Sequence, residues 1–131
     1  MMFTIAQIRA AHSKVKSGRD FPAYIKEIKA LGVTRYETYV TDGHTDYHAD
    51  DNYTATSPAR YAPLVIAAAH NIEAFKAELL AHQQGKTDFL SFIQTCAQLG
   101  IAKWIVKMDV MTCTYYDKAG DALLVENIPA A

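Results

Sequence analysis

The sequence has little of what marks several large classes of protein. Only two of its 131 residues are cysteines, Cys96 and Cys113, and they do not form a CxxC pair. This count argues against a disulfide scaffold and against a zinc finger. No apolar run approaches the roughly 18 residues that cross a bilayer, and no secretory leader precedes the first predicted helix. We therefore expect a soluble cytoplasmic protein with no membrane partner.

The common signatures of catalysis are absent as well. The chain contains no GxSxG, no phosphate-binding GxxxxGK[ST] loop, no GxGxxG and no HExxH. Its formal net charge is −1, so no overall attraction to nucleic acid is expected. These absences exclude the most easily recognised enzymes and nucleic-acid-binding proteins, and leave open whether the protein is an enzyme of another kind.

A repeated segment organises what is present. Residues Asp20 to Tyr36 return 68 positions later as Asp88 to Trp104, with five of 17 positions identical. A chain of this length, 50% hydrophobic, suffices for one domain with a core and is short for two. We therefore expect a single domain, residues 1–131, made of two similar halves at about 3–66 and 71–128.

Hydrophobic periodicity and turn residues predict the same order of elements in each half. Asp20 is expected to cap the second helix and Thr87 or Asp88 the fourth, and Asp42-Gly43 is a strong signal for a β-hairpin. The predicted helices are 5–16, 21–31, 72–83 and 89–99, and the predicted strands are 33–41, 44–49, 53–56, 101–108, 111–116 and 122–126. Each half reads helix, helix, strand, strand, short strand. This order predicts an α+β fold in which an antiparallel sheet packs against four helices.

Three separated runs resemble a known family. They are Tyr36 to Thr45, Ala81 to Asp88 and Met111 to Asp117. In these runs the chain resembles the small bacterial proteins grouped as domain of unknown function 1398, some of which bear the label phage envelope protein. The resemblance covers nearly the whole chain and implies a bacterial protein of about this length. It implies no activity, cofactor or catalytic residue, and the chain has no fibrous repeat that would favour a virion role.

The strand after Asp42-Gly43 carries the most polar pattern in the chain. His44, Asp46 and His48 alternate along it and therefore point to one face of the predicted sheet. Imidazole and carboxylate groups placed in this way can bind a divalent metal ion. The alternative is a polar strand facing solvent. The 68-residue offset places Thr112, Thr114 and Tyr116 at the equivalent positions, so the shared fold does not require the polar ladder.

Aromatic and acidic residues near the same hairpin suggest a second kind of site. Six of them are candidates for a polar-aromatic pocket that binds a small molecule. They are Glu37, Tyr39, His44, Asp46, Tyr47 and Tyr115. With no catalytic signature, the sequence favours a non-catalytic binding or interaction protein, such as a homodimer that uses an exposed strand edge. The alternatives are a small-molecule-binding protein or enzyme with this pocket, and a divalent-metal protein that uses His44, Asp46 and His48.

Overall fold

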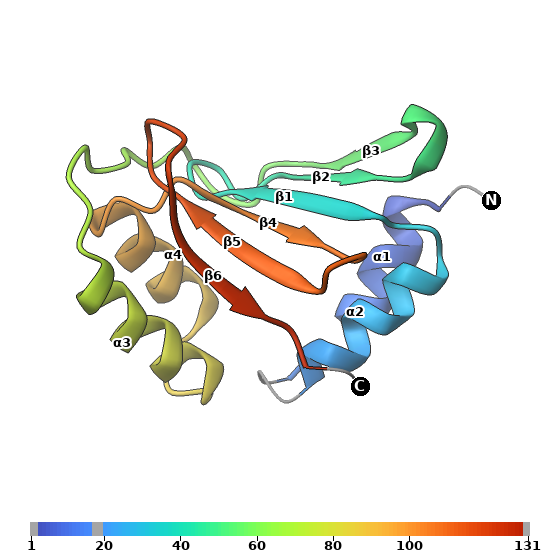
Figure 1. Cartoon of the computed structure of the whole chain (residues 1–131), viewed down its shortest axis with the longest axis horizontal. Coiled ribbons are helices and arrows are strands. Elements are labelled where there is room, and N and C mark those ends of the chain that lie inside the picture. Colours follow the sequence, from blue (N-terminus) through green and yellow to red (C-terminus); the bar gives the residue numbers. More distant parts are fainter. Residues whose placement is uncertain (1–2, 17–19, 130–131) are drawn as a thin grey trace.

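The computed structural model describes residues 3–16 and 20–129 as an antiparallel sheet with helices packed against it (Figure 1). The helices are α1 (Ile5–His12), α2 (Phe21–Ala30), α3 (Ile72–Gln83) and α4 (Phe89–Gln98), and a 3₁₀ turn, η2, spans Asp50–Asn52. The strands are β1 (Arg35–Tyr39), β2 (Thr45–His48), β3 (Thr54–Ser57), β4 (Lys103–Lys107), β5 (Thr112–Tyr116) and β6 (Ala122–Asn127). The predicted α+β fold and the order of its elements are confirmed.

The helix-helix-strand pattern occurs twice, and its bounds agree closely between the halves. The helices α2 and α4 each have ten residues and begin with a phenylalanine, 68 positions apart. The strands β1 and β4 each have five residues and are separated by the same offset. Two local signals are therefore shared by α2 and α4: an apolar stripe along the helix and a glycine after its end.

The two halves meet at the centre of the sheet. The strand order is β3-β2-β1-β4-β5-β6, so each half contributes three neighbouring strands and β1 pairs with β4. In that antiparallel pair, Glu37 lies opposite Ile105, which is the residue 68 positions further along the chain. The midpoint of the pairing therefore falls between two equivalent residues, as a local two-fold relation between the halves requires.

Both helix pairs cover the same face of the sheet. Cross-strand neighbours share a face, and Tyr36 is paired with Tyr47 on one side and with Val106 on the other. Helix α3 contacts this face through Phe75, whose ring lies 5.0 Å from that of Tyr115. The core sits between this face and the helices, and it includes the fully buried Ile25, Ile28, Phe75, Ile93, Ile101 and Val106.

The hairpin between β1 and β2 differs from the prediction. The strands end at Tyr39 and resume at Thr45, so Asp42-Gly43 lies inside a five-residue loop and is not a two-residue turn. The reason is that the carbonyls of Val40, Thr41 and Asp42 do not bond to β2. They accept hydrogen bonds from Tyr61, Leu64 and Arg60 in the segment that follows β3. Strand β1 therefore stops two residues before its predicted end, and His44 falls outside β2.

The two predicted aspartate caps behave differently. Asp88 accepts the N–H of Ser91 at 2.7 Å and caps α4 as expected. Asp20 makes no capping bond to α2, and its carboxylate instead accepts the backbone N–H of Lys16 at 2.9 Å. The prediction for Asp20 was wrong because its carboxylate turns back toward the segment that follows α1.

In the described part of the chain, none of the helices combines the length and apolar character needed to cross a membrane.

Two glycines provide a test of how the second half is packed. Gly85 and Gly100 both have a left-handed backbone, with φ of 78° and 81°. A Cβ on Gly85 would meet nothing within 4 Å, whereas one on Gly100 would lie 2.6 Å from the carbonyl oxygen of Ala69. Gly85→Ala should cost only the left-handed strain of about 1 to 2 kcal/mol. Gly100→Ala should lower the free energy of unfolding clearly further, as measured by urea unfolding. Equal losses would contradict this packing.

Candidate functional site

The face of the sheet that the helices leave uncovered is called the open face below. It carries the residues of β1, β2, β4 and β5 that alternate with the buried ones. Among them, Glu37 on β1 and Lys103 on β4 are half-buried, with 18% and 29% of their side chains exposed. The open face is therefore neither core nor fully solvated surface, and charged groups on it interact through a partly desolvated environment.

The loop at one end of this face is held in place from outside the hairpin. Gly43 has a φ of 79°, and a Cβ there would lie 2.6 Å from the ring of Tyr61. The hydroxyl of Tyr61 donates to the carbonyl of Val40 at 2.6 Å, and the N–H of Arg60 donates to the carbonyl of Asp42 at 2.7 Å. The loop conformation is thus fixed by the segment that follows β3, which positions the side chains of Asp42 and His44.

Asp42 orients the imidazole of His44. Its Oδ1 accepts the backbone N–H of His44 at 3.0 Å and lies 2.5 Å from Nδ1 of the ring. The backbone N–H of His44 is the main cause that lowers the pKa of Asp42, and the imidazole lowers it further. Because Nδ1 is engaged by the carboxylate, Nε2 is the ring nitrogen left to meet another molecule.

Tyr39 connects the histidine to a second group of charges. Its ring stacks on that of His44, with centroids 4.3 Å apart and planes 9° from parallel. Its hydroxyl donates to Oε2 of Glu37 at 3.0 Å, and Lys103 Nζ lies 3.5 Å from the same oxygen. Burial, followed by the bond to Glu37, raises the pKa of Tyr39 to about 12. The phenol therefore stays protonated at neutral pH and acts as a donor.

Lys103 lies between two aromatic rings. Its Nζ is 5.7 Å from the centroid of Tyr39 and 5.5 Å from that of Tyr116, distances at which an ammonium is attracted to an aromatic face. These contacts join β1, β4, β5 and the hairpin loop into one connected set of side chains. We call this set the polar cluster, and its members are Glu37, Tyr39, Asp42, His44, Lys103 and Tyr116.

The three residues of the predicted metal site each contact a different neighbour. His44 is bonded to Asp42, Asp46 accepts the hydroxyl of Thr56 at 2.8 Å, and Nδ1 of His48 lies 3.1 Å from the hydroxyl of Thr54. Within residues 3–16 and 20–129, no three His, Cys, Asp or Glu residues are grouped so that they could hold a metal ion. The metal hypothesis stays a prediction from the sequence.

The predicted small-molecule site divides between the two faces. Glu37, Tyr39 and Asp46 belong to the open face, and His44 stacks on Tyr39 beside them. Tyr47 and Tyr115 belong to the helix-covered face, where they are only 9% and 6% exposed. The alternation of side chains along a strand separates Tyr47 from Asp46 and from the other open-face candidates.

Three members of the polar cluster were not among the predicted site residues. Asp42 was counted as a turn residue, although an aspartate two positions before a histidine can bond to its backbone N–H. Lys103 and Tyr116 belong to the polar cluster because of strand pairing, which places Lys103 opposite both Tyr39 and Tyr116. A prediction that β1 and β4, the equivalent strands of the two halves, pair with each other would have placed Lys103 beside Tyr39.

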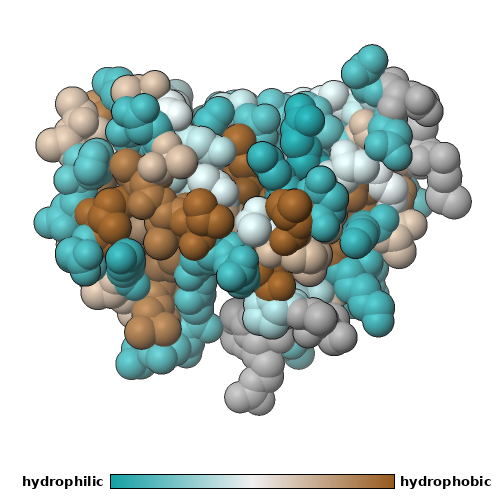
Figure 2. Space-filling view, viewed as in Figure 1, coloured by the Kyte–Doolittle hydropathy of each residue, from teal (hydrophilic) through white to brown (hydrophobic). Residues whose placement is uncertain are grey.

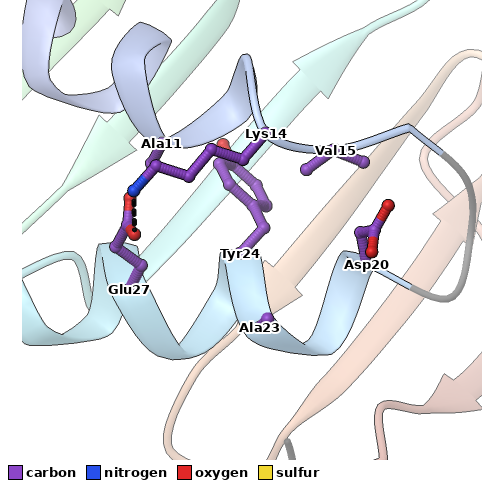
Figure 3. A pocket seen from close by; sticks show the side chains of 7 residues that line it. All are labelled: Ala11, Lys14, Val15, Asp20, Ala23, Tyr24 and Glu27. Carbon is purple, nitrogen blue, oxygen red and sulfur yellow. Dashed lines mark hydrogen bonds and ion pairs between the residues drawn. The ribbon is translucent and has the colours of Figure 1, made fainter.

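A hollow elsewhere on the surface lies between α1 and α2 (Figure 3). Figure 3 shows the ion pair of Lys14 and Glu27 closing one end of it and Tyr24 forming its floor. Its volume of about 170 Å³ is below the range of typical ligand pockets. Residues 17–19, which connect its two walls, lie outside the described residues, and the hollow contains none of the candidate site residues. We assign it no function.

The chain matches a known protein family. A family model described as Protein of unknown function (DUF1398) matches residues 9–127, which is nearly the whole chain. No curated protein matches the chain.

Asp42→Asn tests the charge of the Asp42–His44 contact. Asparagine keeps an oxygen that can accept the N–H of His44 and removes only the charge. Because the pKa of Asp42 is lowered in the folded protein, its charge stabilises the fold above the unfolded-state value of about 3.9, and this contribution is lost as the pH falls through the folded value. Wild type should therefore be more stable than Asp42→Asn at pH 7, and the difference in urea unfolding should shrink below about pH 4. A difference independent of pH would contradict this.

Proposed function

The chain belongs to the family described as Protein of unknown function (DUF1398), and from its geometry we propose that it is a non-catalytic binding protein whose small-molecule ligand lies against the polar cluster of the open face. The observation that supports this proposal most strongly is the stacked pair of Tyr39 and His44. One of the two rings is bonded to Asp42 and the other to Glu37.

These contacts restrain both rings before any ligand arrives. A side chain that is already ordered loses less conformational entropy on binding, so a prearranged surface gains affinity. Tyr39 lies on β1, and His44 lies in a loop fixed by Tyr61, so the backbone determines the positions of both rings. A purely solvated polar strand requires no such restraint, which is why we favour binding.

The charges of the region indicate the class of ligand. Three carboxylates, those of Glu37, Asp42 and Asp46, lie on or beside the cluster, and Lys103 is already paired with Glu37. The surroundings are therefore rich in hydrogen-bond acceptors. We propose a small ring compound that bears a protonated amine or several N–H donors, which would contact the carboxylates while its ring packs beside the tyrosines.

A second candidate function rests on the orientation of His44. A carboxylate bonded to Nδ1 leaves Nε2 directed for proton transfer, which is the arrangement of a general base. Under this alternative the same ligand would be a substrate. The two functions differ in a simple observation: an enzyme changes the bound compound with time, and a binding protein releases it unchanged.

Screening by thermal shift with a library of cyclic amines tests the proposal. A compound that raises the melting temperature should bind His44→Ala about tenfold or more weakly, because the variant lacks both the stacking ring and Nε2. Thr112→Ala is the matched control, since Thr112 lies 68 positions after His44 on the other half of the sheet. It should leave binding unchanged. Calorimetry gives the affinities, and chromatography of the recovered compound separates binding from turnover.

The absence of any stabilising amine, or equal weakening by His44→Ala and Thr112→Ala, would contradict the proposal. The first result would remove the ligand class, and the second would show that the polar cluster is not where the compound binds.

A further inference from the structure

The two edges of the sheet are treated differently by the fold. They are β3 and β6, the last strands in the order β3-β2-β1-β4-β5-β6. The outer backbone N–H and C=O groups of an edge strand can pair with a further strand, and proteins usually prevent this with charge, proline or a covering element. Figure 1 looks onto the β6 edge, where β6 is the strand nearest the viewer.

Strand β3 is better protected than β6. The four residues of β3 are small or polar, and this strand packs against α1. Strand β6 is longer, with the six residues Ala-Leu-Leu-Val-Glu-Asn, and contains no lysine, arginine or proline. It therefore offers a long, mostly apolar edge that is suited to strand pairing.

Exposed large hydrophobic side chains are more frequent in the second half of the chain than in the first. Of the five described large hydrophobic residues that are more than half exposed, four belong to the second half, on α3, on α4, after β4 and on β6, and the fifth, Val65, lies in the connection between β3 and α3. The four are Leu80, Leu90, Val110 and Val125. Figure 2 shows the larger hydrophobic patch on the side of the view that holds α3, α4 and β6. Patches of this kind mark interaction sites more often than featureless surface.

We propose that the outer edge of β6 pairs with β6 of a second copy of this chain, antiparallel and about a two-fold axis, so that two sheets join into one. A two-fold contact brings each group near its own copy, so it disfavours like charges that face each other across the edge. The charged residue of β6, Glu126, is paired with the buried Cys113 and turns to the helix-covered face, where its carboxylate accepts bonds from Gln83 at 3.1 Å and from Tyr115 at 3.4 Å.

The charges beside β6 favour the antiparallel direction. Asp117, Lys118 and Asp121 lie in the turn that precedes β6, which therefore carries a net negative charge. Antiparallel pairing places the acidic turns of the two copies at opposite ends of the shared strands, about 20 Å apart for a strand of this length. A parallel contact would bring the two turns together. In the antiparallel arrangement centred on Val125, two exposed valines face each other, which is a favourable cross-strand pair.

Sedimentation equilibrium of the wild type and two variants tests this interface. Wild type should be a dimer, and Val125→Lys should raise its dissociation constant by about tenfold or more, because two ammonium groups then face each other. Val125 is 58% exposed, so the fold of the monomer should tolerate lysine. The matched control is Val65→Lys, the same substitution at a valine that is 88% exposed in the connection between β3 and α3. It should leave the dimer intact.

Three results would overturn the proposal: a monomeric wild type, a dimer that Val125→Lys does not weaken, or a dimer that both variants weaken equally. If Val125→Lys does not fold, hydrogen exchange of the wild type decides the question. Amides of β6 should become more protected as protein concentration rises, while those of β3 should not change. Concentration-independent exchange in β6 would overturn the interface.

Discussion

The antiparallel pairing of β1 with β4 is the constraint on which the rest of the structure depends. It joins the two halves with Glu37 opposite Ile105, and this register decides that both helix pairs cover the same face. Each pair of helices buries its apolar stripe against three strands that alone would form a small, unstable sheet. Joining the strands provides one continuous core. It also leaves the opposite face of the sheet uncovered, which is where the polar cluster lies.

The residues that the two halves share and those that differ serve different purposes. Shared positions begin helices, form their apolar stripes or follow their ends, and so specify folding. The polar cluster depends on positions that differ: 68 residues after Glu37, Tyr39 and His44 stand Ile105, Lys107 and Thr112. The second half therefore folds in the same way without a carboxylate, tyrosine or histidine at these points. The fold does not need these groups, and we interpret them as functional.

Local signals in the sequence predicted the elements well because helix starts, stripes and glycines act within a few residues. The loop between β1 and β2 was not predicted because its carbonyls bond to Arg60, Tyr61 and Leu64, which lie about 20 residues further along the chain. The polar cluster was predicted in part. Glu37, Tyr39 and His44 are close in the chain, whereas Lys103 reaches them only through β1–β4 pairing. Tyr47 was misplaced, although the period of two already assigned it to the opposite face from Asp46.

The two proposals concern neighbouring surfaces, the polar cluster and the outer edge of β6. Tyr116 of the polar cluster lies on β5 and is paired with Ala122, the first residue of β6. Pairing of β6 with its copy would extend the open face across the dimer and place both clusters on one continuous surface. Ligand binding and self-association nevertheless depend on different atoms, the side chains of the cluster and the backbone of β6. His44→Ala should therefore leave the dimer intact, and Val125→Lys should leave the Tyr39–His44 pair in place, so either proposal can fail without the other.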